Sequence, residues 1–278
     1  MATSKTLSPE TVMTSASLLT SIAAQPTANI ISGTTESETL LGTASADWVS
    51  GDDGDDTLID AGGRTQTGND ALRGGAGEDM IYSQWGRDWL SGGRNHDHLI
   101  SRSDAGEPEI AQDPAAEKYY DAENLTRTQD TLRGGAGNDQ FLFRIDLNAT
   151  AEIIAKHTDD AGDIDWEGVT GENGAPHLHW VESIGDDRIM DYSEAQGDQI
   201  VIEGHTAAFV IRHRDLNGDG IGESIIHLYS DQGGAGAHNG DQLGSITVYG
   251  DRVEANDICL DNMAHHGAFG NISEMPLV

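Results

Sequence analysis

Residues 74–100 read GGAGEDMIYSQWGRDWLSGGRNHDHLI, which is three nine-residue units in a row. Each unit approximates G-G-x-G-x-D-x-U-x, where U is apolar. The glycine-rich part favours a turn, because glycine adopts backbone angles that other residues avoid, and x-U-x leaves room for one short strand. Two units therefore predict one coil with two turns and two strands. Stacked coils would lie about 4.7 Å apart, as strands do in any sheet.

The same frame extends across residues 31–145, with an acid at the sixth position of each unit and an apolar residue at the eighth. The sixth-position residues are Glu38, Asp47, Asp56, Asp70, Asp79, Asp88, Asp97, Asp130 and Asp139. The eighth-position residues are Leu40, Val49, Leu58, Leu72, Ile81, Leu90, Leu99, Leu132 and Phe141. Because each unit supplies one side chain to the interior, the pattern predicts a narrow apolar core between rows of carboxylates.

Calcium suits these turns. The ion takes six to eight oxygens at roughly 2.3 to 2.6 Å, so an ion between two stacked turns can reach carboxylates and main-chain carbonyls of both. The predicted ligands are Asp47, Asp56, Asp70, Asp79, Asp88, Asp97, Asp130 and Asp139. Glu38 is longer and lies in a glycine-poor turn, while Ser83 and Gln84 replace a glycine pair, so both turns are expected to bind calcium weakly. Asn95 also replaces a glycine, but asparagine tolerates the left-handed region.

Two insertions interrupt the frame, and both fall in turns, where a coil can extrude a loop without losing strand register. Residues 60–73 hold five more residues than one unit spacing, and a longer loop insertion lies at about residues 101–128. The second contains Pro108 and Pro114. It is interpreted as a tolerated surface loop, with a ligand-contacting lobe as the alternative.

Composition favours a chain that is ordered by cations. Among 278 residues, 48 are acidic and 15 basic, which gives a formal charge of -33, and only 36% are hydrophobic. Such a chain tends to stay disordered unless its charge is neutralised. The single cysteine, Cys259, excludes a disulfide framework within one chain. A polyanion should repel nucleic acid and acidic membrane surfaces, and no stretch approaches the ~18 apolar residues of a transmembrane segment.

Residues 186–204, DDRIMDYSEAQGDQIVIEG, follow the pattern D-x-I-x-D-Y-x-x-x-x-G-D-x-I-x-I. This pattern resembles the segment after the repeats in serralysin-type proteases and other type I secreted RTX proteins. Together with the nonapeptides, it extends the resemblance to the RTX, or hemolysin-type, family over residues 31–204 apart from the insertions. The resemblance implies a parallel β-roll, a right-handed β-helix of RTX repeats, with several bound Ca²⁺ ions. It also implies export by a type I ABC transporter and a secreted, extracellular protein, but no particular activity.

The C-terminal region is predicted to be rich in strands. Residues 207–213 and 224–230 form apolar-rich strands joined by DLNGDGIGE, and a further strand is expected at residues 245–249. The loop offers a compact calcium site made of Asp215, Asn217, Asp219 and Glu223. Ile226 stands where an EF-hand needs its bidentate glutamate, so an EF-hand is excluded, and a plain acidic turn is the alternative. The ending SEMPLV is similar to the signals of type I substrates.

No catalytic motif accompanies the repeats. The sequence contains neither H-E-x-x-H nor G-x-S-x-G. The pairs His96/His98 and His177/His179 could bind zinc if each lay on one strand face, but solvated histidines are the simpler interpretation. The function predicted is a non-catalytic extracellular binding or matrix component. The alternative is an extracellular polysaccharide-acting enzyme or its accessory module, and the cell surface is a second candidate partner.

The predicted organisation is all-β, a parallel β-roll with a β-rich C-terminal cap. Residues 1–30 form a flexible arm, and residues 31–145 form the roll. Residues 146–204 connect the roll to a post-repeat cap, and residues 205–278 hold the C-terminal strands and the secretion signal.

Overall fold

The fold is given by a computed structural model that describes residues 29–61, 68–102, 129–149, 151–160, 164–165, 168, 179–181, 183–204, 207–220, 222–230 and 242–261. The predicted N-terminal arm up to residue 28, most of the long insertion and the tail after residue 261 lie outside these residues.

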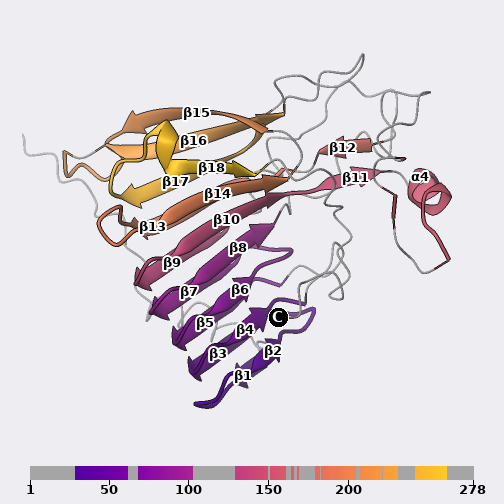
Figure 1. Cartoon of the computed structure of the whole chain (residues 1–278), viewed down its shortest axis with the longest axis horizontal. Coiled ribbons are helices and arrows are strands. Elements are labelled where there is room, and N and C mark those ends of the chain that lie inside the picture. The colour runs from indigo at the N-terminus through magenta and orange to yellow at the C-terminus, as the bar shows by residue number, and fades with distance from the viewer. Residues whose placement is uncertain are drawn as a thin grey trace, which may run out of the picture.

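The repeat region is a stack of coils in which consecutive strands alternate between two parallel sheets (Figure 1). The first sheet holds β1 (Asn29–Ser32), β3 (Asp47–Asp53), β5 (Ala71–Ala76), β7 (Trp89–Arg94) and β9 (Thr131–Ala136). The second sheet holds β2 (Thr39–Leu41), β4 (Thr57–Ile59), β6 (Met80–Tyr82), β8 (His98–Arg102) and β10 (Gln140–Ile145). Each strand pairs with the strand of the next coil, so the predicted coil of two units is confirmed.

The core consists of the eighth-position side chains, which stack in two columns between the sheets. Leu58, Ile81 and Leu99 are in register in the second sheet. Leu72 and Leu90 are in register in the first. All five are 0% exposed. Burying such a side chain stabilises a fold by about 1.5 to 3 kcal/mol, so the columns supply the apolar energy that joins successive coils.

The two sheets continue beyond the last recognisable repeat. In the first sheet, β9 pairs in parallel with β13 (Gly185–Tyr192), and β13 pairs with β17 (Gln242–Gly250). In the second sheet, β10 pairs with β14 (Gln199–Gly204), and β14 pairs with β18 (Ile258–Asp261), which follows the short helix η1 (Ala255–Asp257). Ile189 and Ile200 are buried and extend the two core columns.

The C-terminal end is closed by antiparallel strands. A hairpin of β15 (Ala207–Arg214) and β16 (Glu223–Ser230) adds to the edge of β17, so the first sheet changes from parallel to antiparallel (Figure 1). Ile226, Leu228 and Ile246 are 0% exposed and continue the core beneath this cap. The all-β class, the parallel roll and the β-rich cap are therefore confirmed, as is the hairpin.

A small lateral element lies beside the roll. It consists of the antiparallel pair β11 (Leu147–Ala149) and β12 (His179–Val181) and the helix α4 (Ala151–Lys156) (Figure 1). The chain enters it from the end of β10, where Asp146 receives two hydrogen bonds from Arg102 of β8, at 3.2 and 3.0 Å. This ion pair is buried and fixes the point at which the chain leaves the roll.

Candidate calcium sites

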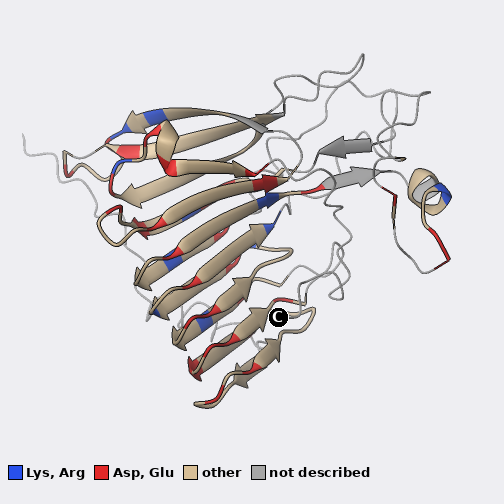
Figure 2. Cartoon of the chain, in the orientation of Figure 1, with Lys and Arg blue, Asp and Glu red and all other residues tan. Residues whose placement is uncertain are grey.

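The sixth-position aspartates form two ladders, because consecutive turns alternate between the two edges of the roll. In the first ladder, the Oδ1 atom of each aspartate accepts the backbone N–H of the acid one coil earlier. These bonds run from Glu38 to Asp56 at 2.8 Å, Asp56 to Asp79 at 2.9 Å, and then Asp79 to Asp97, Asp97 to Asp139 and Asp139 to Asp198, each at 3.0 Å. Figure 2 shows acidic residues, coloured red, recurring from coil to coil near the ends of the strands.

The second ladder has the same backbone arrangement. Its bonds run from Asp47 to Asp70 at 2.6 Å and then Asp70 to Asp88, Asp88 to Asp130 and Asp130 to Asp187, each at 2.8 Å. The structure thus brings together the eight aspartates predicted from the repeats, four in each ladder. They are at most 2% exposed.

Asp187 and Asp198 end the ladders, and the repeat frame did not include them as candidate ligands. Each nevertheless precedes a buried isoleucine, Ile189 or Ile200, by two residues, as a sixth-position aspartate precedes its core residue. This D-x-I spacing was the available signal. These turns lack the glycine pair, and residues 146–184 separate them from the repeats, so the nine-residue frame does not extend to them.

Glycine at the first position of a unit is required in the first ladder. A Cβ atom added to Gly51, Gly74 or Gly92 would overlap the carboxylate oxygen Oδ2 of the aspartate in the same turn. The glycines at the second and fourth positions serve a different contact. The carbonyl oxygens of Asp52 and Gly54 lie against the α-carbons of the second- and fourth-position glycines one coil later, where a Cβ would overlap them. Asn95, in a fourth position, has φ 79°, as expected for a residue that replaces glycine.

These turns have the oxygens that a calcium ion needs. The Oδ2 atoms of Asp56, Asp79 and Asp97 are buried and accept no hydrogen bond from the described part of the chain. An unpaired buried carboxylate oxygen is costly. The carbonyl oxygen of Gly74 and Oδ2 of Asp56 both lie against the α-carbon of Gly51. A carboxylate with carbonyls is the donor set that Ca²⁺ prefers. The residues of the first ladder therefore fit calcium.

The pKa values of the first-ladder aspartates also favour a bound cation. Burial raises the pKa of Asp79 to about 6 and that of Asp97 to about 8, with further increases from the charges of Asp56 and Asp79, respectively. Burial also raises the pKa of Asp139 to about 6. The folded coil therefore resists holding these groups as bare anions, so a bound cation would relieve the cost of their burial.

The second ladder satisfies several of its carboxylates without a metal. The hydroxyl of Ser83 donates to Oδ2 of Asp130 at 2.6 Å, and the hydroxyl of Ser101 donates to Oδ2 of Asp187 at 3.0 Å. Both serines occupy the first position of a unit, where the first ladder has glycine. The Asp47 carboxylate accepts hydrogen bonds from the Asn29 amide, at 2.7 Å, and from the backbone of its own turn.

The carboxylates at the loop between β15 and β16 accept hydrogen bonds from the backbone of that loop. Oδ1 of Asp215 accepts the N–H of Gly218 at 2.6 Å, and Oε2 of Glu223 accepts the N–H of Leu216 at 2.6 Å. The Asn217 side chain contacts Asp219. The proposed loop ligands are therefore close together in sequence and in space, while several of their oxygens already hold the turn. Of the histidine pairs, His96 accepts the N–H of Asn138, and His177 lies outside the described residues.

The stacked coils and their aspartate ladders define a calcium-binding parallel β-roll. The family model of the RTX calcium-binding nonapeptide repeat matches the chain in 4 copies, over residues 32–63, 65–99 and 127–142. The repeats of this protein are therefore RTX repeats, as the sequence indicated, and calcium is the ion that they bind. Within the described residues, no helix is long and apolar enough to span a membrane.

Solved structures of other proteins resemble the chain at low identity. One is the solution structure of the AlgE6R3 subunit from the Azotobacter vinelandii mannuronan C5-epimerase, with 20% identity over 81% of this chain and 79% of that chain, at a TM-score of 0.27. Another is the extracellular lipase LipA from Serratia marcescens, with 14% identity over 85% of this chain and a TM-score of 0.23. The match spans 40% of the lipase chain. Among curated proteins, no significant relative is found.

Proposed function

We propose that this is a secreted protein whose roll folds when calcium fills the turns of the first ladder outside the cell, and that it acts there as a non-catalytic binding or matrix component. The observation that carries the proposal is the set of buried, unpaired Oδ2 atoms of Asp56, Asp79 and Asp97. Burying these oxygens without a partner destabilises the coil, and a bound ion removes that cost. The free energy of calcium binding therefore contributes to the free energy of folding.

The negative charge of the chain opposes folding in the absence of calcium. At a formal charge of -33, carboxylates stacked coil upon coil repel one another. Calcium at cytosolic levels leaves weak sites empty, whereas extracellular calcium stabilises the fold by RT ln(1 + [L]/Kd) at each site. Magnesium should substitute poorly, because its smaller octahedral shell is reluctant to give up water for carbonyl-rich turns.

Circular dichroism of the full chain tests this proposal. In chelator the spectrum should be that of an expanded chain, and β structure should appear in millimolar calcium and much less in millimolar magnesium. A calcium-bound spectrum that does not change when excess chelator is added would refute calcium-dependent folding.

Export is a separate part of the proposal. We infer that the chain leaves the cell through a type I ABC transporter and that the signal lies after β18, in residues 262–278. Deleting these residues spares every described strand. The truncated protein should therefore accumulate in the cell and still fold in calcium after lysis. Normal secretion of this truncation would contradict the proposed signal.

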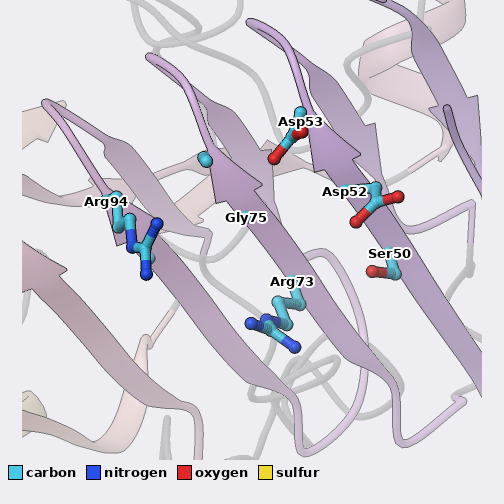
Figure 3. A pocket seen from close by; sticks show the side chains of 8 residues that line it. Ser50, Asp52, Asp53, Arg73, Gly75 and Arg94 are labelled. Atoms are coloured by element: carbon cyan, nitrogen blue, oxygen red, sulfur yellow. The ribbon is translucent and has the colours of Figure 1, made fainter. Parts of the chain in front are cut away.

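A surface hollow favours a polysaccharide as the binding partner. It has a volume of about 400 Å³ and lies over β3, β5 and β7 (Figure 3). Its lining residues are Ser50, Asp52, Asp53, Arg73, Gly75, Ala76, Gly93 and Arg94. Both arginines are exposed, and the two glycines leave the backbone open to close approach. Asp52 and Asp53 of β3 would repel an acidic ligand, so only the part of the hollow over β5 and β7 suits one. Arginine pairs in bidentate fashion with carboxylates, so an acidic sugar polymer held there by Arg73 and Arg94 is the second candidate ligand.

The hollow is tested with a paired substitution at constant calcium. Replacing Arg73 and Arg94 by glutamine should reduce retention on an immobilised polyuronate, while binding to a neutral glucan should stay at background. Arg252→Gln is the control, because Arg252 is an exposed arginine of the cap that pairs with Glu254. Equal retention of the parent and the double variant would show that the hollow does not bind the polymer. Turnover of the polymer by the parent would favour the enzyme instead.

A further inference from the structure

One turn of the second ladder has a carboxylate where the two coils that follow it have a hydroxyl. Ile59, Tyr82 and Ile100 are in register in the second sheet, so the residues that follow them, Asp60, Ser83 and Ser101, form a column at the first position of successive turns. Each serine donates its proton to the aspartate of the following coil. Asp60 occupies the same place relative to Asp88, but an ionised carboxylate has no proton to donate.

The carboxylates around Asp60 are close together and sealed from solvent. Carboxylate oxygens of Asp60, Asp70 and Asp88 all lie within 4.8 Å of one another. Their exposed fractions are 1%, 2% and 2%. Oδ2 of Asp70 and Oδ2 of Asp88 accept no hydrogen bond from the described residues. One Asp60 oxygen, Oδ2, accepts the N–H of Gln84 at 3.2 Å.

We propose that Asp60, Asp70 and Asp88 hold one hard divalent cation at a site of their own, separate from the calcium turns of the first ladder. Two ligands of one ion can be at most twice the metal–oxygen distance apart, which is about 5 Å for calcium, and the three oxygens meet that limit. The site differs in kind from a glycine-rich turn, because three carboxylates supply the charge. Three buried carboxylates repel one another unless they hold protons, and a bound cation would offset that repulsion.

The neighbouring turns provide the matched variant. Asp60→Ser gives the column three serines, and the new hydroxyl should donate to Asp88 as Ser83 donates to Asp130. Bound calcium per chain, counted by equilibrium dialysis with ⁴⁵Ca on the full-length protein, should fall by one ion. The melting temperature in excess chelator should not fall, because the hydroxyl replaces a repelling charge. Asp160→Ser removes the same charge from an exposed position outside the roll and should leave the count unchanged.

A second variant covers the case in which Asp60→Ser fails to fold. Asp60→Asn keeps the size of the side chain and should also lose one ion, with the circular dichroism of the calcium-loaded parent. An unchanged ion count in a folded Asp60 variant, or an equal loss in Asp160→Ser, would overturn the site. The inference is independent of first-ladder calcium. If the first-ladder proposal alone fails, Asp97→Asn will bind as many ions as the parent, while Asp60→Ser will still bind one fewer.

Discussion

Three aspartates of the first ladder, Asp56, Asp79 and Asp97, have two structural roles, one for each carboxylate oxygen. Oδ1 holds the backbone of the previous coil, and Oδ2 is left buried for an ion, as Asp79 illustrates. An acid at a sixth position is therefore not equivalent to an acid beside it. Glu78 is adjacent to Asp79 but exposed.

Asp79→Asn tests this difference against Glu78→Gln, which removes the same charge. Asparagine can still accept the backbone bond but supplies no anionic oxygen, and calcium affinity depends on the number of charged ligands. The calcium midpoint for folding should rise about tenfold or more in Asp79→Asn. In Glu78→Gln it should stay constant or fall slightly. Equal shifts in the two titrations would mean that the ladder acids act only through net charge.

Gly74→Ala tests the need for glycine at a first position. The added Cβ would overlap Oδ2, Cγ and Cβ of Asp79, a buried side chain that also holds the backbone of the previous coil. Calcium-dependent folding should require more calcium and should reach a lower melting temperature. Gly222→Ala is the matched control, because the nearest atoms to its added Cβ are 3.6 Å away. A Gly74 variant that melts like the Gly222 variant would contradict the packing described for this turn.

At the scale of elements, the sequence predicted what repeats locally. The coil of two units and the neighbours of Asp79 follow from one nine-residue frame, and the β15–β16 hairpin follows from two apolar runs around a glycine-rich loop. The Ser83 bond to Asp130 did not follow, because it crosses an insertion and joins residues 47 positions apart. The Asp60 cluster did not follow from the sequence either. Its members come from different coils, so they are brought together only by the stacking of those coils.

The ladders predict a response to pH in the absence of metal. The pKa of Asp97 is raised by burial to about 8 and that of Asp79 to about 6, above an unfolded value of about 3.9. A raised pKa means that the folded chain binds more protons, so this contribution is complete below about pH 4 and is lost as the pH rises through 6 to 8.

In chelator, β structure should therefore increase as the pH is lowered from about 8 to about 4, and the melting temperature should rise with it. In calcium the trend should reverse, because protons compete with the ion for the same oxygens. Both titrations can be followed by circular dichroism. Chelated protein that is least ordered at pH 4 would contradict the raised pKa values.

The whole molecule is a stack in which register is set by the coil rather than by the single unit. Asp79 and Asp97, one coil apart in the first ladder, are 18 residues apart. Units of nine residues alternate between edges whose turns differ, since the first position is glycine in the repeats of the first ladder, whereas on the other edge it changes from Gly42 to Asp60, Ser83 and Ser101. Length can therefore change by whole coils but not by half coils.

Two deletions test this rule. Removing residues 74–91 takes out one coil and joins Arg73 to Gly92, which preserves both ladders, so the shortened protein should fold in calcium and bind fewer ions. Removing residues 74–82 takes out half a coil and places Ser83 where Gly74 must be. That variant should stay unfolded at calcium concentrations that fold the parent. Folding of both variants at the same calcium midpoint would show that the two edges are interchangeable.

The antiparallel cap also determines the order in which the parts of the chain are expected to fold. β15 and β16 are joined by a short loop and close at small entropic cost, whereas ladder partners in the roll are 18 to 59 residues apart. Folding is therefore expected to start at the cap and to advance one coil at a time towards β1. Because a ribosome makes the chain in the opposite direction, the repeats emerge before the surface that nucleates them. The repeats of the nascent chain are therefore expected to stay unfolded until the last strands have been synthesised.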